Sequence, residues 1–118
     1  LIHADLVREN IFIDGDCVSF IDFDDSAFGW RIYDLAVILA SVRTEACFPM
    51  IQDALLAGYN DERPLSPASV DLLPLLMLVR NLSHVGWIAD RMGTPGADES
   101  LRRFIRNCVA QAETLGMG

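Results

Sequence analysis

The tripeptide Asp14-Gly15-Asp16 stands between two short segments rich in β-forming residues, 11–13 (IFI) and 18–23 (VSFIDF). A glycine between such segments can adopt the positive φ that a tight hairpin turn requires. From Arg31 onward, apolar residues recur at helical spacing. The sequence therefore predicts one short β-hairpin followed by helices, an α+β domain that is mainly α.

Prolines, glycines and capping residues divide the helical part into four or five helices. Ser66-Pro67 is typical of an N-cap followed by proline at the first helical position, and Pro74 should kink or split the segment that follows. Asp98 is expected to cap the last helix. The expected helices cover Trp30–Val42, Phe48–Tyr59, Pro67–Met92 with its break, and the segment from Asp98 to Leu115.

Charge and apolar content limit the possible partners. A formal charge of -8 disfavours binding to a nucleic-acid backbone, which is neutralised by cationic side chains. The apolar fraction of 52% exceeds the usual range for a soluble domain, so part of the apolar surface should face something else, such as a second copy in a homodimer. The chain opens with the apolar dipeptide Leu1-Ile2 directly before the candidate catalytic triplet His3-Ala4-Asp5, and we expect residues 1–118 to be a fragment.

Cysteine usage and hydropathy favour a cytoplasmic protein. Cys17, Cys47 and Cys108 are odd in number and form no CxxC pair, which favours reduced, buried thiols. The longest apolar run, Leu72–Val79, is too short to span a bilayer. We therefore expect no membrane segment.

Carboxylates and an amide gather around the predicted hairpin. Asp5 and Asn10 precede it and Asp22 lies at its far end, so the hairpin should bring Asn10 back beside Asp22. Phosphoryl transfer uses a carboxylate that accepts the proton of the attacking hydroxyl, together with oxygen ligands for magnesium. Asp5 suits the role of base, and Asn10 and Asp22 suit the role of ligands.

The strings HADLVREN, FIDFDD and YDLA together resemble the aminoglycoside phosphotransferase family, which includes choline kinase-like enzymes and has a protein-kinase-like fold. The resemblance implies the C-terminal lobe of an ATP- and Mg2+-dependent kinase that phosphorylates a hydroxyl of a small molecule. It covers about the first 40 residues. An amine-bearing acceptor is slightly favoured by the acidic composition.

The resemblance also implies roles for further residues. His3 would orient the catalytic loop, residues 3–10, and Asp34 would hold that loop by accepting hydrogen bonds from its backbone. Asp24 stands where kinases often have glycine and would reach a second metal ion. Ala4 replaces the usual glycine. The nucleotide-binding lobe should precede Leu1; this chain has no lysine to hold phosphates, so we expect it to be inactive alone.

Two other side chains have open interpretations. Arg8 lies within the catalytic loop, where its cation would approach the transferred phosphate or form a surface pair with Glu9 or Asp16. Trp87 falls at helical spacing with His84 and Asp90, a pattern typical of packing; alternatively, it binds a cationic acceptor by a cation–π contact.

Two other functions compete with the kinase hypothesis. FIDFDD also resembles the nucleophile motif of haloacid-dehalogenase-like phosphatases, in which Asp22 would form an aspartyl-phosphate. The lack of lysine and the unexplained His3, Asp5 and Asn10 weigh against that function. The second alternative is a non-catalytic kinase-like lobe that serves for binding or dimerisation.

Overall fold

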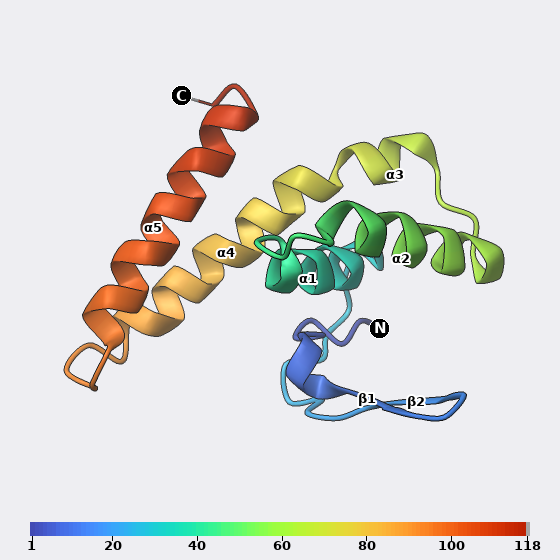
Figure 1. Cartoon of the computed structure of the whole chain (residues 1–118), viewed down its shortest axis with the longest axis horizontal. Helices are drawn as coiled ribbons and strands as arrows, with labels where there is room; N and C mark the ends of the chain where they lie inside the picture. Colours follow the sequence, from blue (N-terminus) through green and yellow to red (C-terminus); the bar gives the residue numbers. More distant parts are fainter. Residues whose placement is uncertain (118) are drawn as a thin grey trace. The chain divides into compact units, whose positions relative to one another are not determined.

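The predicted hairpin is confirmed by the computed structural model, which describes residues 1–117. Strands β1 (Ile11–Asp14) and β2 (Cys17–Phe20) pair antiparallel, and Gly15 opens their two-residue loop with a φ of 57° (Figure 1). Strand β2 ends three residues earlier than predicted. Ile11 pairs with Phe20, so the residue opposite Ile21 is Asn10, which belongs to a 3-10 turn, η1 (Arg8–Asn10), that the sequence did not predict.

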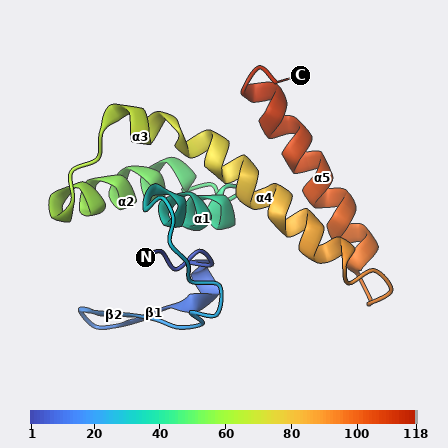
Figure 2. The ribbon, with the colours of Figure 1, turned by 180° about the vertical axis from the view of Figure 1, so that it is seen from behind.

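The chain divides into two units, one covering Leu1–Leu73 and the other beginning at Pro74. The core of the first unit is built on α1 (Ile32–Val42), two residues shorter at its start than predicted. The apolar residues whose spacing predicted this helix are all buried: Ile32, Leu35, Ala36 and Leu39. Helix α1 contacts α2 (Phe48–Glu62) and also η1 (Figures 1 and 2). It is therefore the element that supports the predicted catalytic loop.

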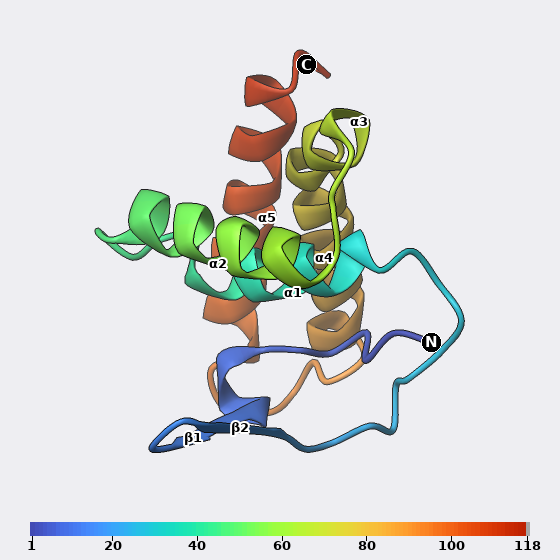
Figure 3. The same ribbon diagram turned by 90° about the vertical axis from the view of Figure 1, so that its right-hand side faces the viewer.

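A long loop leads from β2 to α1 and passes next to the N-terminal segment (Figure 3). Ile2 and Ala27 form a bridge there, with N···O distances of 2.8 and 3.2 Å. A Cβ atom on Gly29 would lie 2.7 Å from Cδ1 of Ile2, so this position has no space for a side chain. The bridge and the close approach of Gly29 fix the start of the catalytic loop against the loop that follows the hairpin.

The predicted break at Pro74 is confirmed, and two helices replace the single segment. Helix α3 (Pro67–Asp71) begins after Ser66, whose side chain accepts a hydrogen bond from the backbone N–H of Ser69, and α4 covers Leu73–Ala89. Pro74 thereby lies in the first turn of α4, where a missing N–H removes no helical hydrogen bond. The expected extension to Met92 is wrong, since α4 ends at Ala89.

In the second unit, α4 and α5 (Ala97–Thr114) are joined by a buried hydrogen bond and by a ring contact between His84 and Phe104. The Asn81 amide donates to Oε1 of Gln111 at 2.8 Å, and both side chains are buried. The N-cap of α5 is Gly96, not the predicted Asp98, because Gly96 adopts a φ of 81° and Asp98 already lies in the first turn. An acidic residue in the first turn still stabilises the helix dipole.

The expectation of buried thiols is confirmed for Cys108 alone. All three cysteines are free, but Cys17 and Cys47 are exposed. Burial raises the pKa of the Cys108 thiol. The hairpin that carries Cys17 is exposed on both faces, which explains why an apolar neighbourhood in sequence did not bury this side chain.

The stretch Pro67–Ala89 is long and apolar enough, by length and composition alone, to cross a membrane. Its mean hydropathy is 1.4 over the best 18 residues, of which 33% are buried. The stretch is longer than the eight-residue apolar run Leu72–Val79 considered in the sequence, because the helical segment continues beyond that run through Arg80 and Asn81. Core helices of soluble proteins meet the same criterion, so the absence of a membrane segment stays a prediction.

Replacing Asn81 with Ala should lower the free energy of unfolding by about 1–3 kcal/mol, because Gln111 would keep a buried carbonyl without its donor. Chemical denaturation measures this loss. Asn107→Ala, at an exposed position of the same helix pair, should change stability by less than about 0.5 kcal/mol. Equal effects of the two substitutions would contradict a stabilising role for the buried pair.

Candidate active site

The carboxylate of Asp34 binds the start of the catalytic loop. It accepts hydrogen bonds from the backbone N–H of His3, at 2.9 Å, and from that of Ala4, at 2.8 Å. Asp34 lies in the first turn of α1, where a negative charge is also stabilised by the helix dipole. One side chain thus attaches the loop to the helix that forms the core of the first unit.

Ala4 is held in the left-handed region, with a φ of 67°. This conformation costs an L-residue other than glycine roughly 1–2 kcal/mol. Hydrogen bonds to a charged acceptor contribute roughly 1.5–3 kcal/mol each, so the two bonds to Asp34 outweigh the strain. Alanine is therefore tolerated at a position whose backbone favours glycine.

His3 connects the catalytic loop to the residues that follow the hairpin. Its Nε2 lies 2.8 Å from the carbonyl oxygen of Ile21, and its Nδ1 accepts from the backbone N–H of Asp5 at 3.4 Å. The neutral ring with its proton on Nε2 satisfies both contacts. The ring also packs against Phe23, with 4.5 Å between centroids. The buried imidazole therefore touches the backbone on both sides of the candidate site.

Asp5 and Asn10 are joined directly. The Nδ2 group of Asn10 donates to the backbone carbonyl of Asp5 at 2.9 Å and lies 3.3 Å from its carboxylate oxygen Oδ2. The backbone carbonyl of Asn10 in turn accepts from the N–H of Ile21 at 3.1 Å. The predicted return of the chain to Asn10 is thus present in the backbone, one residue before Asp22.

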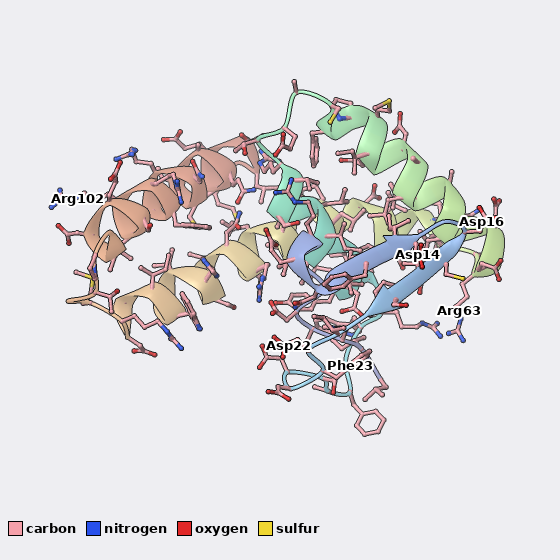
Figure 4. The ribbon with its side chains drawn as sticks, turned by 60° about the horizontal axis from the view of Figure 1, so that its bottom comes forward. Asp14, Asp16, Asp22, Phe23, Arg63 and Arg102 are labelled. Atoms are coloured by element: carbon pink, nitrogen blue, oxygen red, sulfur yellow. The ribbon has the colours of Figure 1, made fainter. Side chains whose placement is uncertain are left out.

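Asp22 lies at the base of the hairpin, whereas Asp14 and Asp16 lie at its tip (Figure 4). Asp22 has a φ of 62°, a conformation that Asp tolerates better than most residues, and its side chain is exposed. Asp24 is exposed two residues further on. Among the residues from 1 to 117, no group of three His, Cys, Asp or Glu side chains has an arrangement that could hold a metal ion.

A magnesium site would have to combine carboxylates with an amide. Asn10 donates to Asp5 through Nδ2, so Oδ1 is the atom of its amide that could bind a cation. Asp22 adds a carboxylate next to the Ile21 junction. Magnesium takes oxygen ligands and usually keeps several waters or phosphate oxygens, so two protein ligands fit its chemistry.

Trp87 belongs to the second unit and is half exposed. The guanidinium carbon of Arg91 lies 3.8 Å from its ring centroid, and the imidazole of His84 stacks on it at 5.4 Å. A cation–π contact is therefore present at this ring, with Arg91 as its cation. Its binding of an acceptor stays a prediction.

Arg8 pairs with neither of the acids that the sequence suggested. Its Nη1 lies 4.0 Å from Oε1 of Glu45, in the connection between α1 and α2. Both side chains are largely exposed, at 72% and 51%. Exposed pairs of this kind contribute little to stability.

Sequence reasoning missed the contacts that align the site. Phe23 covers His3, the Ile21 carbonyl anchors the imidazole, and Gly29 allows the bridge at Ile2. Gly29, which follows Phe28, was a sequence signal for a close approach of the backbone to another segment. The backbone partners had no signal in the sequence, because they depend on the register in which the loop meets the hairpin.

The model of the phosphotransferase enzyme family APH matches residues 1–68. The matched range includes the catalytic loop, the hairpin, α1 and α2. This chain belongs to the APH family. Membership confirms the resemblance that the motifs indicated and leaves the phosphatase alternative without support.

This APH-family chain is similar to homoserine kinases. It is 44% identical to the homoserine kinase of Brucella anthropi over 80 residues, which are 64% of this chain and 24% of that protein. The homoserine kinase of Pseudomonas aeruginosa is 35% identical over 82 residues, 66% of this chain and 26% of its own length. The chain thus matches about a quarter of the length of these relatives. No solved structure shows a significant match.

Substituting Asp34 with Asn should loosen the catalytic loop. An amide keeps one acceptor oxygen but turns an N–H2 group toward the second backbone N–H, at a cost of about 1–3 kcal/mol. Amide hydrogen exchange at His3 and Ala4 should accelerate by roughly tenfold or more. Asp53→Asn, at an exposed position of α2, is the matched control. Unchanged exchange in Asp34→Asn would contradict the attachment.

Proposed function

We propose that this APH-family chain supplies the catalytic loop of an ATP-dependent kinase that phosphorylates a hydroxyl of a small molecule. The observation that carries the proposal is the hydrogen-bonded unit of Asp5 and Asn10, attached to α1 through Asp34. Phosphoryl transfer depends mainly on positioning and on charge neutralisation. Hydrogen bonds to the loop backbone and between its side chains hold Asp5 and Asn10 in place, which provides the positioning.

The proposed roles follow from the chemistry of the side chains. The Asp5 carboxylate would orient the acceptor hydroxyl and accept its proton, while His3 keeps the loop backbone in place. Asn10 and Asp22, with Asp24 as a further candidate, would hold magnesium bound to ATP. The metal ion would supply neutralisation of phosphate charge, and this chain has no lysine to share that task.

The acceptor that we propose is a hydroxyl amino acid. Its support is the similarity to homoserine kinases from two organisms, at 44% and 35% identity over about two thirds of this chain. Such an acceptor carries an amine, as the acidic composition suggested. We also propose that the chain forms the C-terminal lobe of a kinase-like fold and that another segment supplies the nucleotide-binding groups. A homodimer would cover part of the apolar surface.

A non-catalytic binding module is the alternative that family membership leaves open. The complete set of Asp5, Asn10 and Asp22, together with the ordered contacts of the loop, favours catalysis. A module that had lost its activity would have no chemical need for an acid and an amide in this arrangement.

Asp5→Asn in the complete gene product should reduce kcat for homoserine by about 100- to 10,000-fold, because the acceptor proton loses its base. Magnesium-dependent ADP release measures the rate, with aminoglycosides, choline and sugars as parallel acceptors. Asp14→Asn, at the hairpin tip, should retain activity (Figure 4). Transfer that survives in Asp5→Asn would remove Asp5 from the role of base, and transfer to none of the acceptors would favour the binding module.

A further inference from the structure

We propose that Arg8 binds the carboxylate of the acceptor and thereby selects hydroxyl compounds that carry a carboxylate over those that lack one. The inference rests on the proposed function, and it gives Arg8 a role other than the contact with the transferred phosphate that the sequence left open. Arg8 lies three residues after the proposed base and two before the proposed metal ligand Asn10. Arg8 is therefore close in sequence to both Asp5 and Asn10, and the direction of its side chain decides whether it contacts the acceptor or the nucleotide phosphates.

The turn that carries Arg8 directs it away from Asn10. Arg8 and Asn10 are the first and last residues of η1, and a 3-10 helix has about three residues per turn, so their side chains leave the turn about 120° apart. Asn10 is buried and bonded to Asp5, whereas Arg8 is exposed and reaches Glu45. The anion nearest to Arg8 should therefore come from the acceptor and not from the nucleotide phosphates on the Asn10 side.

Glu45 already presents a carboxylate to Arg8. The 4.0 Å separation and the exposure of both groups make this a weak pair that an incoming carboxylate can replace. A guanidinium binds a carboxylate through two parallel hydrogen bonds when the geometry allows, which gives recognition as well as attraction. Glu45 would thus compete with the acceptor carboxylate for the guanidinium, and binding of the acceptor would replace this pair.

The charge of the chain makes a local cation necessary for an acceptor that carries a carboxylate. A formal charge of -8, with the base and the proposed metal ligands at the site, repels a carboxylate. Arg8 is the cation of the loop between Asp5 and Asn10. Removing it should therefore cost more for an acceptor with a carboxylate than for the same compound with that carboxylate replaced by an amide.

The test compares L-homoserine with L-homoserine amide in the complete gene product. These acceptors share the hydroxyl and the amine and differ in the carboxylate. Arg8→Gln should lower kcat/KM for homoserine by about tenfold or more, mainly through KM, and leave the amide within about twofold. Arg8→Lys should recover part of the preference, and Glu45→Gln should lower KM for homoserine by freeing the guanidinium.

Arg102→Gln is the matched control, since Arg102 is equally exposed, at 73%, and forms an exposed pair with Asp98 on α5 (Figure 4). It should leave the preference for the acid unchanged. Parallel losses for both acceptors in Arg8→Gln, an unchanged preference, or an effect on the KM of ATP instead would overturn the inference while the kinase activity itself stands. Absence of transfer by the unsubstituted protein would overturn the proposed function and this inference with it.

Discussion

The candidate site depends on one carboxylate that accepts two backbone N–H groups. Asp34 receives the amides of His3 and Ala4, and this attachment joins the catalytic loop to the buried helix α1. The bonds outweigh the strain of an alanine in the left-handed region. With the loop fixed at this end, the hydrogen bonds between Asn10 and Asp5 fix the other, and His3 connects both to the hairpin.

Around the η1 turn, two kinds of chemistry are separated by direction. Asn10 points inward, where its amide is bonded to Asp5, and Arg8 points outward to Glu45. In our account Asn10 serves the metal and the phosphates, Asp5 beside it serves the acceptor hydroxyl, and Arg8 serves the acceptor carboxylate. Two residues of one short 3-10 turn can therefore bind two different substrates, because their side chains point in different directions.

Much of the fold was predictable because its signals are local. The Asp-Gly-Asp turn, the Ser66-Pro67 cap, the break before Pro74 and the apolar spacing of α1 each depend on a few adjacent residues. The predicted end of β2 was wrong because Asn10, the residue opposite Ile21, belongs to η1 and not to β1. The predicted start of α5 was wrong because Gly96 is the N-cap. For the site, the residue types were predictable from chemistry, but their backbone partners and the Glu45 partner of Arg8 depend on contacts between distant segments.

Binding of a paramagnetic ion tests most directly the claim that Asn10 and Asp22 form the metal side of a kinase site. Manganese replaces magnesium at oxygen ligands, and with ATP present it should broaden the backbone amide signals of nearby residues in the isotope-labelled gene product. We predict the strongest broadening around Asn10 and Asp22 and its loss in Asn10→Ala. Broadening centred on Asp14 and Asp16 at the hairpin tip, or unchanged in Asn10→Ala, would contradict the account.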